Sequence, residues 1–317
     1  MELGCWCLEF QLAEQNFLSR FSVCFGRLRA VKFSIVTPSF NQSHWLKLCV
    51  ASIADQQGVE LEHIVQDAGY TDGTQDWLAK DSRVKTVVEK DGGMYDAINR
   101  GFRKASGDMV AYLNCDEQYL PGALKAVAET SARHPDADIV LADSVVVDEQ
   151  GQFICCRKSL VPYRLWAWTY MPTLTSSIFI RRRVLDDFNL YFDIRWKILG
   201  DAVWMKEAMS LRLKMVVLRR YTSIFTETGE NLWLKPTHLR ERQLAVRMMP
   251  WWVRWFRWPL MQAHRVRAVC NRLYWENPFT YSLYTMASPD RRVDIFVPKP
   301  TGIWWRRHEH AKLLKPL

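Results

Sequence analysis

Short apolar runs alternate with amphipathic stretches along the first two thirds of the chain, and this alternation predicts strands interleaved with helices. The run Phe33–Val36 stops at Pro38, as a buried strand followed by a loop would. Later runs predict strands within 60–67, 84–90, 109–114 and 137–148. Apolar residues at helical spacing predict helices over 44–56, 75–80, 94–107, 121–134 and 201–211.

Strands that alternate with helices favour right-handed parallel crossovers and an open α/β sheet. Ligands of such sheets bind beyond the carboxyl ends of the strands. Pro38, Asp67, Asp91 and Asp116 all fall at such predicted ends. The pattern therefore places candidate chemistry at one edge of the sheet. Residues 160–235 mix strand-like runs with one helix and are less regular.

Composition is that of a globular protein, with 49% apolar and 24% charged residues in 317. The net charge of +9 is unevenly placed, because residues 235–317 hold 16 Lys and Arg against 5 Asp and Glu. Eight scattered cysteines without a CxxC pair suit a reducing compartment. No apolar run is long enough to span a membrane, and Glu2, Glu9 and Glu14 precede any basic residue, unlike a signal peptide. We expect a cytoplasmic protein.

The segments "QDAGYTDGT" (66–74) and "EKDGGMYDAINRG" (89–101) each follow a predicted strand, and "LNCDE" (113–117) follows the next. Glycines let the backbone approach a ligand, and an Asp at a strand end can accept an N–H from a nucleobase. Each segment alone also fits a simple Asp-Gly turn. Asn114, Asp116 and Glu117 likewise fit either a cap before Pro121 or a cation site.

Taken together, "VTPSFNQ", "VQDAGYTDGT", "EKDGGMYDAINRGFRKASGDMVAYLNCDE" and "MPTLTSSIFIRRRVL…ILGDAVWM" resemble the family-two glycosyltransferases. The bacterial exopolysaccharide, capsule and O-antigen enzymes are the most similar branch. The resemblance covers about residues 31–235 and is densest over 89–117. It implies the GT-A fold, a Rossmann-like open mixed sheet flanked by helices. It also implies a nucleotide-diphosphate sugar as donor, a divalent cation (Mn²⁺ or Mg²⁺) and inversion at the anomeric carbon.

The resemblance also implies a donor site, in which Arg100 replaces the commoner Lys of the family's "YDAxNKG" helix. That change keeps the charge but makes it a planar fork. The implied nucleotide-binding residues are Thr37 and Pro38, which would line the pocket, Asp67, which would contact the base, and Asp96, Asn99 and Arg100, which would face the nucleotide.

Metal and diphosphate binding would fall to Asn114, Asp116 and Glu117, because "LNCDE" stands where the family has a DxD motif. An extended strand would place Asn114 and Asp116 on one side and Cys115 on the other. Carboxylate and amide oxygens are hard ligands that suit such a cation. With Asn in the first position, one negative charge is missing.

Asp201 occupies the family's base position in "LGDAVWM". Because it opens a predicted helix, it also fits an N-cap, and a cap hydrogen bond would lower its pKa and weaken it as a base. Asp193 is the fallback candidate. The chain departs from the family pattern at Thr173 and Thr175, on the acceptor side.

The C-terminal quarter has a different texture, with aromatic and basic residues interleaved between Pro250 and Pro259. Such a segment suits an anionic membrane surface, where each basic residue contributes about 1 kcal/mol. Packing on the protein itself or on another copy is the main alternative, and stacked nucleic acid is the least favoured. The residues concerned are Trp251, Trp252, Arg254, Trp255, Arg257 and Trp258.

The expected organisation is an N-terminal extension over 1–30, a GT-A domain over 31–235 and a helical, basic, Trp-rich extension over 236–317. Within the domain, 31–125 would be the nucleotide-sugar half and 126–235 the acceptor half. The leading hypothesis is a metal-dependent inverting glycosyltransferase that extends a lipid-linked or growing surface polysaccharide at the inner face of the cell membrane.

Two other hypotheses remain open at this point. One is a non-catalytic, membrane-docked interaction protein built on a degenerate transferase domain, which Asn114 and the altered acceptor side would allow. The other is a nucleotidyltransferase, but "TPSFNQSH" lacks the Gly-rich, basic phosphate loop that such enzymes carry after their first strand.

Overall fold

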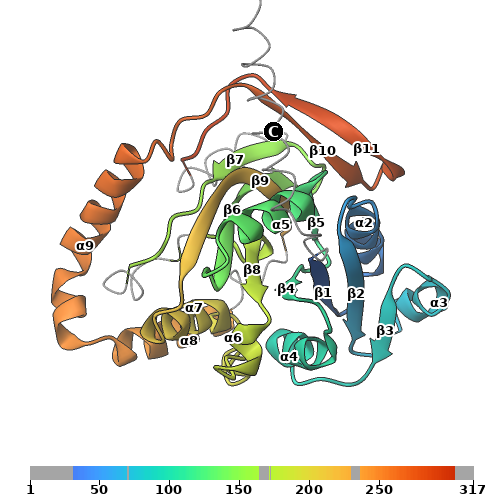
Figure 1. Ribbon diagram of the computed structural model, residues 1–317, viewed down its shortest axis with the longest axis horizontal. Coiled ribbons are helices and arrows are strands. Elements are labelled where there is room, and N and C mark those ends of the chain that lie inside the picture. The colour runs from blue at the N-terminus through green and yellow to red at the C-terminus, as the bar shows by residue number, and fades with distance from the viewer. Residues whose placement is uncertain (1–30, 70, 164–170, 172, 230–235, 304–317) are drawn as a thin grey trace, which may run out of the picture. The chain divides into compact units, whose positions relative to one another are not determined.

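The computed structural model of the protein describes residues 31–69, 71–163, 171, 173–229 and 236–303. The chain divides into two units, Met1–Val31 and Lys32–Leu317, and the fold described below is that of the second (Figure 1). The role predicted for residues 1–30 lies outside the described residues.

Nine strands form one mixed sheet with the order β3-β2-β1-β4-β8-β6-β9-β5, and β7 pairs with β6 off this path. The strands are β1 (Lys32–Ser39), β2 (Glu60–Asp67), β3 (Lys85–Val88), β4 (Met109–Tyr112), β5 (Glu117–Tyr119), β6 (Ile139–Asp148), β7 (Phe153–Arg157), β8 (Ile178–Arg181) and β9 (Met215–Glu227). A 3₁₀ turn, η1 (Thr175–Ser177), leads into β8.

The first four strands pair in parallel, as the alternating sequence pattern predicts. In the register, Ser39 lies opposite Asp67, Asp67 opposite Val88, and Val36 opposite Tyr112. The second half of the sheet is mixed, because β8 runs antiparallel to both β4 and β6 while β9 runs parallel to β6. The open mixed sheet expected from the resemblance is confirmed.

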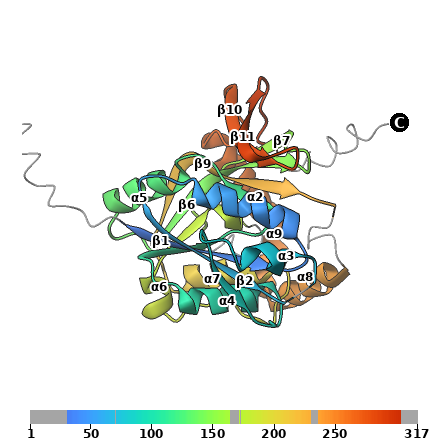
Figure 2. The same ribbon diagram turned by 90° about the vertical axis from the view of Figure 1, so that its right-hand side faces the viewer.

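Helices cover both faces of the sheet (Figure 2). Helices α2 and α5 lie on one face, and α4, α6 and α7 lie on the other. Gly101 of α4 lets that helix approach β1 closely, since an added Cβ would come within 2.4 Å of Val36. The helices of this body are α2 (Ser43–Ala54), α3 (Thr74–Leu78), α4 (Met94–Lys104), α5 (Ala123–Arg133), α6 (Arg183–Asp186) and α7 (Gly200–Ser210).

The largest core cluster lies between the sheet and the helices α4, α6 and α7. Ile98 and Phe102 of α4 and Trp204 and Met205 of α7 are all buried in it. Since each fully buried side chain of this size contributes about 1.5–3 kcal/mol, this cluster fastens the two halves of the sheet to a common layer of helices.

The C-terminal segment contains helices α8 (Pro236–Met248) and α9 (Trp251–Cys270), followed by a two-stranded antiparallel sheet of β10 (Phe279–Thr285) and β11 (Ser288–Val297). The helical, Trp-rich extension that the sequence predicts is confirmed by α8 and α9, and the β-hairpin after them was not predicted. Tyr281 and Leu283 of β10 pack against Val145 and Val147 of β6.

Candidate active site

The carboxyl ends of β1, β2, β3 and β4 meet at one edge of the sheet, because these strands are parallel and in register. Asp67 closes β2, residues 89–93 follow β3, and Asn114–Asp116 follow β4. Segments that are up to about eighty residues apart in the chain are thereby brought together, as the sequence pattern predicts.

The segment Asn114–Glu117 is a tight turn between β4 and β5 rather than the continuation of a strand. The backbone N–H of Glu117 donates to the carbonyl of Asn114 (3.1 Å), and the N–H of Asn114 donates to the Glu117 carboxyl (2.8 Å). The Cys115 thiol donates to the Pro38 carbonyl (3.2 Å) and is buried. Asn114 and Asp116 stay partly exposed. The two therefore lie on one side and Cys115 on the other, as predicted, although a turn rather than a strand produces this arrangement.

Burial raises the pKa values of both Asp116 and Glu117, and their proximity adds to the shift at Glu117. Glu117 is 1% exposed, and one of its carboxyl oxygens accepts the Asn114 N–H, whereas its Oε1 atom is buried without a hydrogen-bond partner in the part of the chain that the structure describes. Its part in holding metal or diphosphate stays a prediction.

Two oxygens of this turn fit a cation. Among the described residues, no side chain donates to the Asp116 carboxylate, and the Asn114 Oδ1 atom is buried without a hydrogen-bond partner. The residues described contain no group of three His, Cys, Asp or Glu side chains that would hold a metal by themselves. A cation here would therefore need oxygens from a bound diphosphate as further ligands, which is common for Mg²⁺.

Three carboxylates, Asp67, Asp91 and Asp96, gather at the ends of β2 and β3 around the cation of Arg100. Asp67 is buried and accepts the N–H of Gly69 (3.0 Å). Asp96 accepts the N–H of Gly92 (2.9 Å) and two N–H groups of Arg100 (3.1 and 2.9 Å). The pKa of Asp91 is raised, chiefly by burial and then by Asp96 and Asp67. These contacts order the loop that follows β3 around the Asp96–Arg100 pair.

Asp96 and Arg100 form an ion pair, and Arg100 also reaches Glu89 (3.3 Å). The planar fork of Arg, noted from the sequence as a replacement for Lys, is thus used to hold the loop that follows β3.

Two residues predicted to bind the nucleotide point elsewhere. The Thr37 side chain is fully buried and hydrogen-bonds His63 (2.9 Å), because alternation along β1 turns it away from the face that Pro38 presents. Both polar ends of the Asn99 amide bind the backbone of Phe192, at 2.7 and 2.9 Å. Thr37 thus belongs to the core, and Asn99 ties α4 to the segment before α7. Their contacts with the nucleotide stay predictions.

Asp201 lies in the first turn of α7, one residue after Gly200, and its N-cap is Leu199. Its carboxylate accepts the N–H of Ala202 (2.7 Å), and the Tyr95 hydroxyl lies 3.4 Å from the same oxygen. Burial nevertheless raises the pKa of Asp201 to about 6, so the expected lowering by a cap is outweighed. A carboxylate with this pKa is a better proton acceptor than an exposed Asp.

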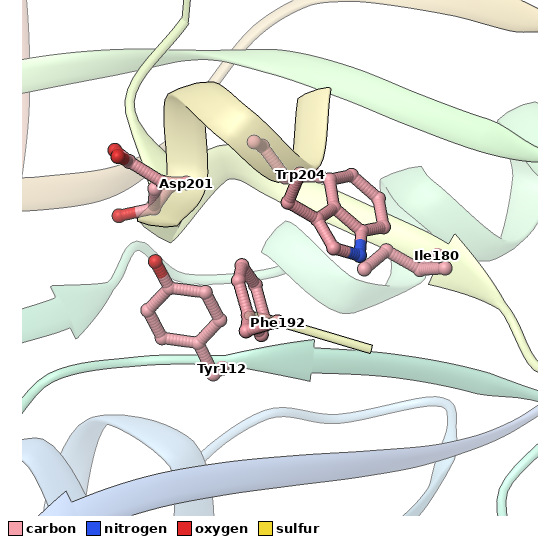
Figure 3. A pocket seen from close by; sticks show the side chains of 7 residues that line it. Tyr112, Ile180, Phe192, Asp201 and Trp204 are labelled. Atoms are coloured by element: carbon pink, nitrogen blue, oxygen red, sulfur yellow. The ribbon is translucent and has the colours of Figure 1, made fainter. Parts of the chain in front are cut away.

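Asp201 faces a small cavity floored by aromatic rings (Figure 3). Tyr112 points its hydroxyl toward Asp201, and Phe192 and Trp204 stack beside Tyr112, with their ring centroids 5.7 Å apart. Tyr112 stands two residues before Asn114, so it connects the base candidate with the Asn114–Asp116 turn. The cavity is lined by Tyr112, Thr175, Ile178, Ile180, Phe192, Asp201 and Trp204.

Sequence reasoning missed the aromatic residues of this site. In the sequence, Tyr95 and Tyr112 look like core positions of a helix and a strand. Their place in the site comes from their interactions with Asp201, which lies 106 positions after Tyr95. Phe40 is 57% exposed at the end of β1, beside the site, and only its apolar exposure marks it. The fallback base, Asp193, is instead paired with Arg195 (2.7 Å), which lowers its pKa.

The Trp-rich segment forms the first half of α9. Trp251, Trp255 and Trp258 are 68%, 80% and 71% exposed, and Arg254 is exposed beside them. Trp252 and Arg257 are partly buried, and Val253 forms the buried contact of this turn. Packing on the protein itself therefore does not account for the three exposed Trp side chains. No helix among the described residues has the length and apolar character to cross a membrane.

Comparison with known proteins matches residues 34–186 to the model of Glycosyl transferase family 2. An uncharacterized glycosyltransferase of Nostoc sp. is 25% identical over 187 residues, which cover 54% of this chain and 57% of that protein. The GalNAc(5)-diNAcBac-PP-undecaprenol beta-1,3-glucosyltransferase of Campylobacter jejuni is 32% identical over 104 residues, covering 31% of this chain and 34% of that protein.

A crystal structure of S. aureus TarS 1–349 in complex with UDP-GlcNAc aligns with a TM-score of 0.51 and 22% identity. The alignment covers 63% of this chain and 60% of that chain, and it shows that the fold is shared. The chain spans about half the length of the curated relatives it matches. Residues 34–186 therefore form a domain of glycosyltransferase family 2, and the shared arrangement of sheet and helices is that of the GT-A fold.

Proposed function

We propose that the protein transfers a sugar from a nucleotide-diphosphate sugar to a surface-glycan acceptor, with inversion at the anomeric carbon and with Asp201 as the base. The observation that carries the proposal is the raised pKa of Asp201, at a cavity whose Tyr112 wall leads directly into the Asn114–Asp116 turn. The base, at the start of α7, and the diphosphate site, after β4, are then neighbours on either side of Tyr112, as a single displacement needs.

The donor's nucleotide would lie at the ends of β1 and β2. Buried Asp67 is placed to accept an N–H from the base, and the exposed ring of Phe40 offers a stacking surface. The related TarS structure holds UDP-GlcNAc, which supports a nucleotide sugar as the donor class.

The diphosphate would lie over the turn after β4. Asp116 and the amide oxygen of Asn114 would hold a divalent cation together with diphosphate oxygens, and the cation, when bound, neutralises the charge of the leaving group. Because only one of these two ligands is charged, we expect weak cation binding in the absence of nucleotide.

The transfer step is a direct displacement. The acceptor hydroxyl gives its proton to the Asp201 carboxylate, and its oxygen forms a bond to the anomeric carbon from the face opposite the diphosphate. The bond between that carbon and the diphosphate oxygen breaks, and the nucleoside diphosphate leaves with the electron pair. The product has the opposite anomeric configuration.

A screen of UDP-, GDP- and dTDP-sugars for release of nucleoside diphosphate, with and without Mn²⁺, tests this proposal. We expect release from at least one donor, dependent on Mn²⁺, and loss of release in Asp116→Ala and Asp201→Asn. Calorimetry with the same nucleotide sugars separates the alternative. Absence of both turnover and Mn²⁺-dependent binding would favour the non-catalytic interaction protein.

The exposed face of α9 supports an acceptor carried on a lipid. One relative is named for transfer to an undecaprenol-linked diphosphate sugar, and α9 presents three exposed Trp side chains. The helix holds four Arg residues and no Asp or Glu, which complements an anionic leaflet. We propose that α9 rests on the inner membrane surface.

Sedimentation with vesicles of phosphatidylglycerol and phosphatidylcholine tests this surface. Trp255→Ala combined with Trp258→Ala should reduce the bound fraction several-fold, whereas Phe296→Ala, which removes an exposed ring from β11, should not. Equal binding of all three proteins would contradict a lipid contact through α9. Dimerisation that the double variant abolishes would instead favour packing between copies.

A further inference from the structure

Glu241, on α8, and Asp201 both lie beyond residues 34–186, which match the family model, and the side chain of Glu241 reaches the segment that carries Asp201. It is 8% exposed, whereas its neighbours Arg240 and Arg242 are exposed. Its Oε1 accepts the backbone N–H of Lys197 (2.6 Å), and its Oε2 accepts those of Ile198 (3.0 Å) and Leu199 (2.9 Å).

Three consecutive N–H groups on one carboxylate form a strong, charge-assisted clamp. Leu199, the N-cap of α7, has no side chain that can accept a hydrogen bond, so the helix lacks a cap of its own. Glu241 supplies a negative charge at that N-terminus from another helix, where the helix dipole favours it. The ordering of residues 197–199 therefore depends on α8.

The same segment is held from the opposite side by α4. The Tyr95 hydroxyl donates to the Ile198 carbonyl (2.9 Å) and receives the N–H of Asp201 (3.2 Å). The Lys197 ammonium donates to the Gly92 carbonyl (2.7 Å), which joins the segment to the loop after β3. Glu241 and Tyr95 together leave the backbone before Asp201 little freedom.

Close packing makes this arrangement sensitive to small movements. An added Cβ on Gly200 would come within 2.6 Å of the Tyr95 ring, so the ring lies directly against the backbone next to Asp201. A shift of residues 197–199 would therefore be transmitted to the Asp201 carboxylate rather than absorbed.

Glu241 also contributes charge to the site. The ionisable groups that act on Asp201 are Tyr95 from α4, Tyr112 from β4 and Glu241 from α8. Of these, Glu241 raises the pKa of Asp201, after the larger effect of burial. The charge of Glu241 thus raises the pKa of Asp201, as burial does.

We propose that Glu241 is a positioning residue for the glycosyl-transfer site: by clamping the N–H groups of Lys197, Ile198 and Leu199, it holds Asp201 in place for proton transfer. This inference rests on the proposed role of Asp201. It means that α8 completes the setting of Asp201, although both lie beyond the residues that match the family model.

Hydrogen exchange of the full chain tests the clamp without any substrate. In Glu241→Ala, the amides of residues 197–203 should exchange at least about tenfold faster, while those of α4 and β4 keep their protection. Glu241→Gln, which keeps the shape and loses the charge, should give a smaller increase. The matched control is Glu207→Ala, which removes an exposed carboxylate from α7 itself. Unchanged exchange at 197–203 in Glu241→Ala would overturn the proposal.

Turnover of a donor found in the screen supplies the second readout. We expect Glu241→Ala to lower kcat by about 10- to 100-fold with little change in the KM for the donor, and Glu207→Ala to leave both unchanged. In Glu241→Gln, the acidic limb of the pH–rate profile should move to lower pH.

These outcomes separate the two proposals. Activity retained in Asp201→Asn would overturn the base assignment, whereas an inactive Asp201→Asn with a fully active Glu241→Ala would overturn only the positioning role.

Discussion

At the scale of single residues, burial gives Asp201 its chemistry. Its neighbours lower the pKa through hydrogen bonds from Ala202 and Tyr95, and desolvation raises it by more, to about 6. The sequence shows an Asp at a helix start, which by itself argues for a lowered pKa. The pKa of Asp201 is raised rather than lowered because α4, β4 and α8 bury its carboxyl, and no local sequence pattern reveals this burial.

The pKa of Asp201 predicts opposite pH dependences for activity and stability. Transfer should fall as the pH drops below about 6, because the base must be deprotonated. Since the folded-state pKa lies above the ordinary value of 3.8, the folded protein binds this proton more tightly than the unfolded chain. This group's contribution to stability therefore decreases as the pH rises from about 4 to about 6.

Asp201→Asn separates these effects. The variant should lose transfer at every pH and, in urea unfolding, be at least as stable as the wild type at pH 7.5, because a neutral amide avoids the cost of burying a charge. A less stable variant at that pH would contradict the assignment of the shift to burial.

Asn114 sets the charge of the proposed cation site. Asn114→Asp should tighten Mn²⁺ binding in the presence of nucleoside diphosphate, measured by calorimetry, because it adds an anionic oxygen where a neutral one lies. It should also lower the stability of the cation-free protein, since burial already raises the pKa values of Asp116 and Glu117. Unchanged Mn²⁺ affinity would show that residue 114 is not a ligand.

At the scale of elements, Arg292 joins the β10–β11 hairpin to the end of α2 and to β5. Its guanidinium donates two hydrogen bonds to the carboxylate of Asp55, the residue that follows α2 (2.6 and 2.8 Å), and one to the Tyr119 carbonyl (2.9 Å). Gln118 exchanges two hydrogen bonds with the backbone of Tyr284. The hairpin thereby supports β5, which directly follows the Asn114–Asp116 turn.

Arg292→Leu should lower the free energy of unfolding by about 2 kcal/mol, because it leaves Asp55 without its cation and three carbonyl oxygens without this donor. Urea unfolding measures the change. The neighbouring Arg291 is exposed, and Arg291→Leu should change stability by less than about 0.5 kcal/mol. Equal effects of the two substitutions would contradict the contribution of the Asp55 pair.

At the scale of the whole molecule, the second structural unit begins at Lys32. The Lys32 N–H donates to Asp108 (3.0 Å), and Lys32 and Phe33 pair with Glu60 and Leu61 of β2. The interactions that anchor β1 thus start at this residue.

A chain that begins at Val31 should keep the unfolding free energy and nucleotide affinity of the full chain. A chain that begins at Ile35 loses the first pairs of β1 and the buried Phe33, and should be destabilised by about 3 kcal/mol or more. Denaturant unfolding and calorimetry compare the three proteins. A loss of stability in the chain from Val31 would assign a structural role to the first thirty residues.

Local pattern was sufficient for β1 to β4, β6 and the helices α2 to α5, because apolar periodicity reports which face of an element is buried. It also brought Asp67, Asp91 and Asp116 to one edge, since parallel strands end on the same side. It did not predict the short strands β5 and β7. It did not indicate that the Thr37 and Asn99 side chains bind His63 and the Phe192 backbone. It also did not indicate the β10–β11 hairpin that follows the Trp-rich helix.

The sequence alone determined the family, the alternation of the sheet and its helices, and the order of the loops that hold the candidate chemistry, because these depend on residue type and spacing along the chain. Only the tertiary structure decided the state of Asp201, the aromatic floor beneath it and the link from Glu241. These features depend on desolvation and on contacts between residues up to 106 positions apart, and no local stretch of the sequence reveals either of them.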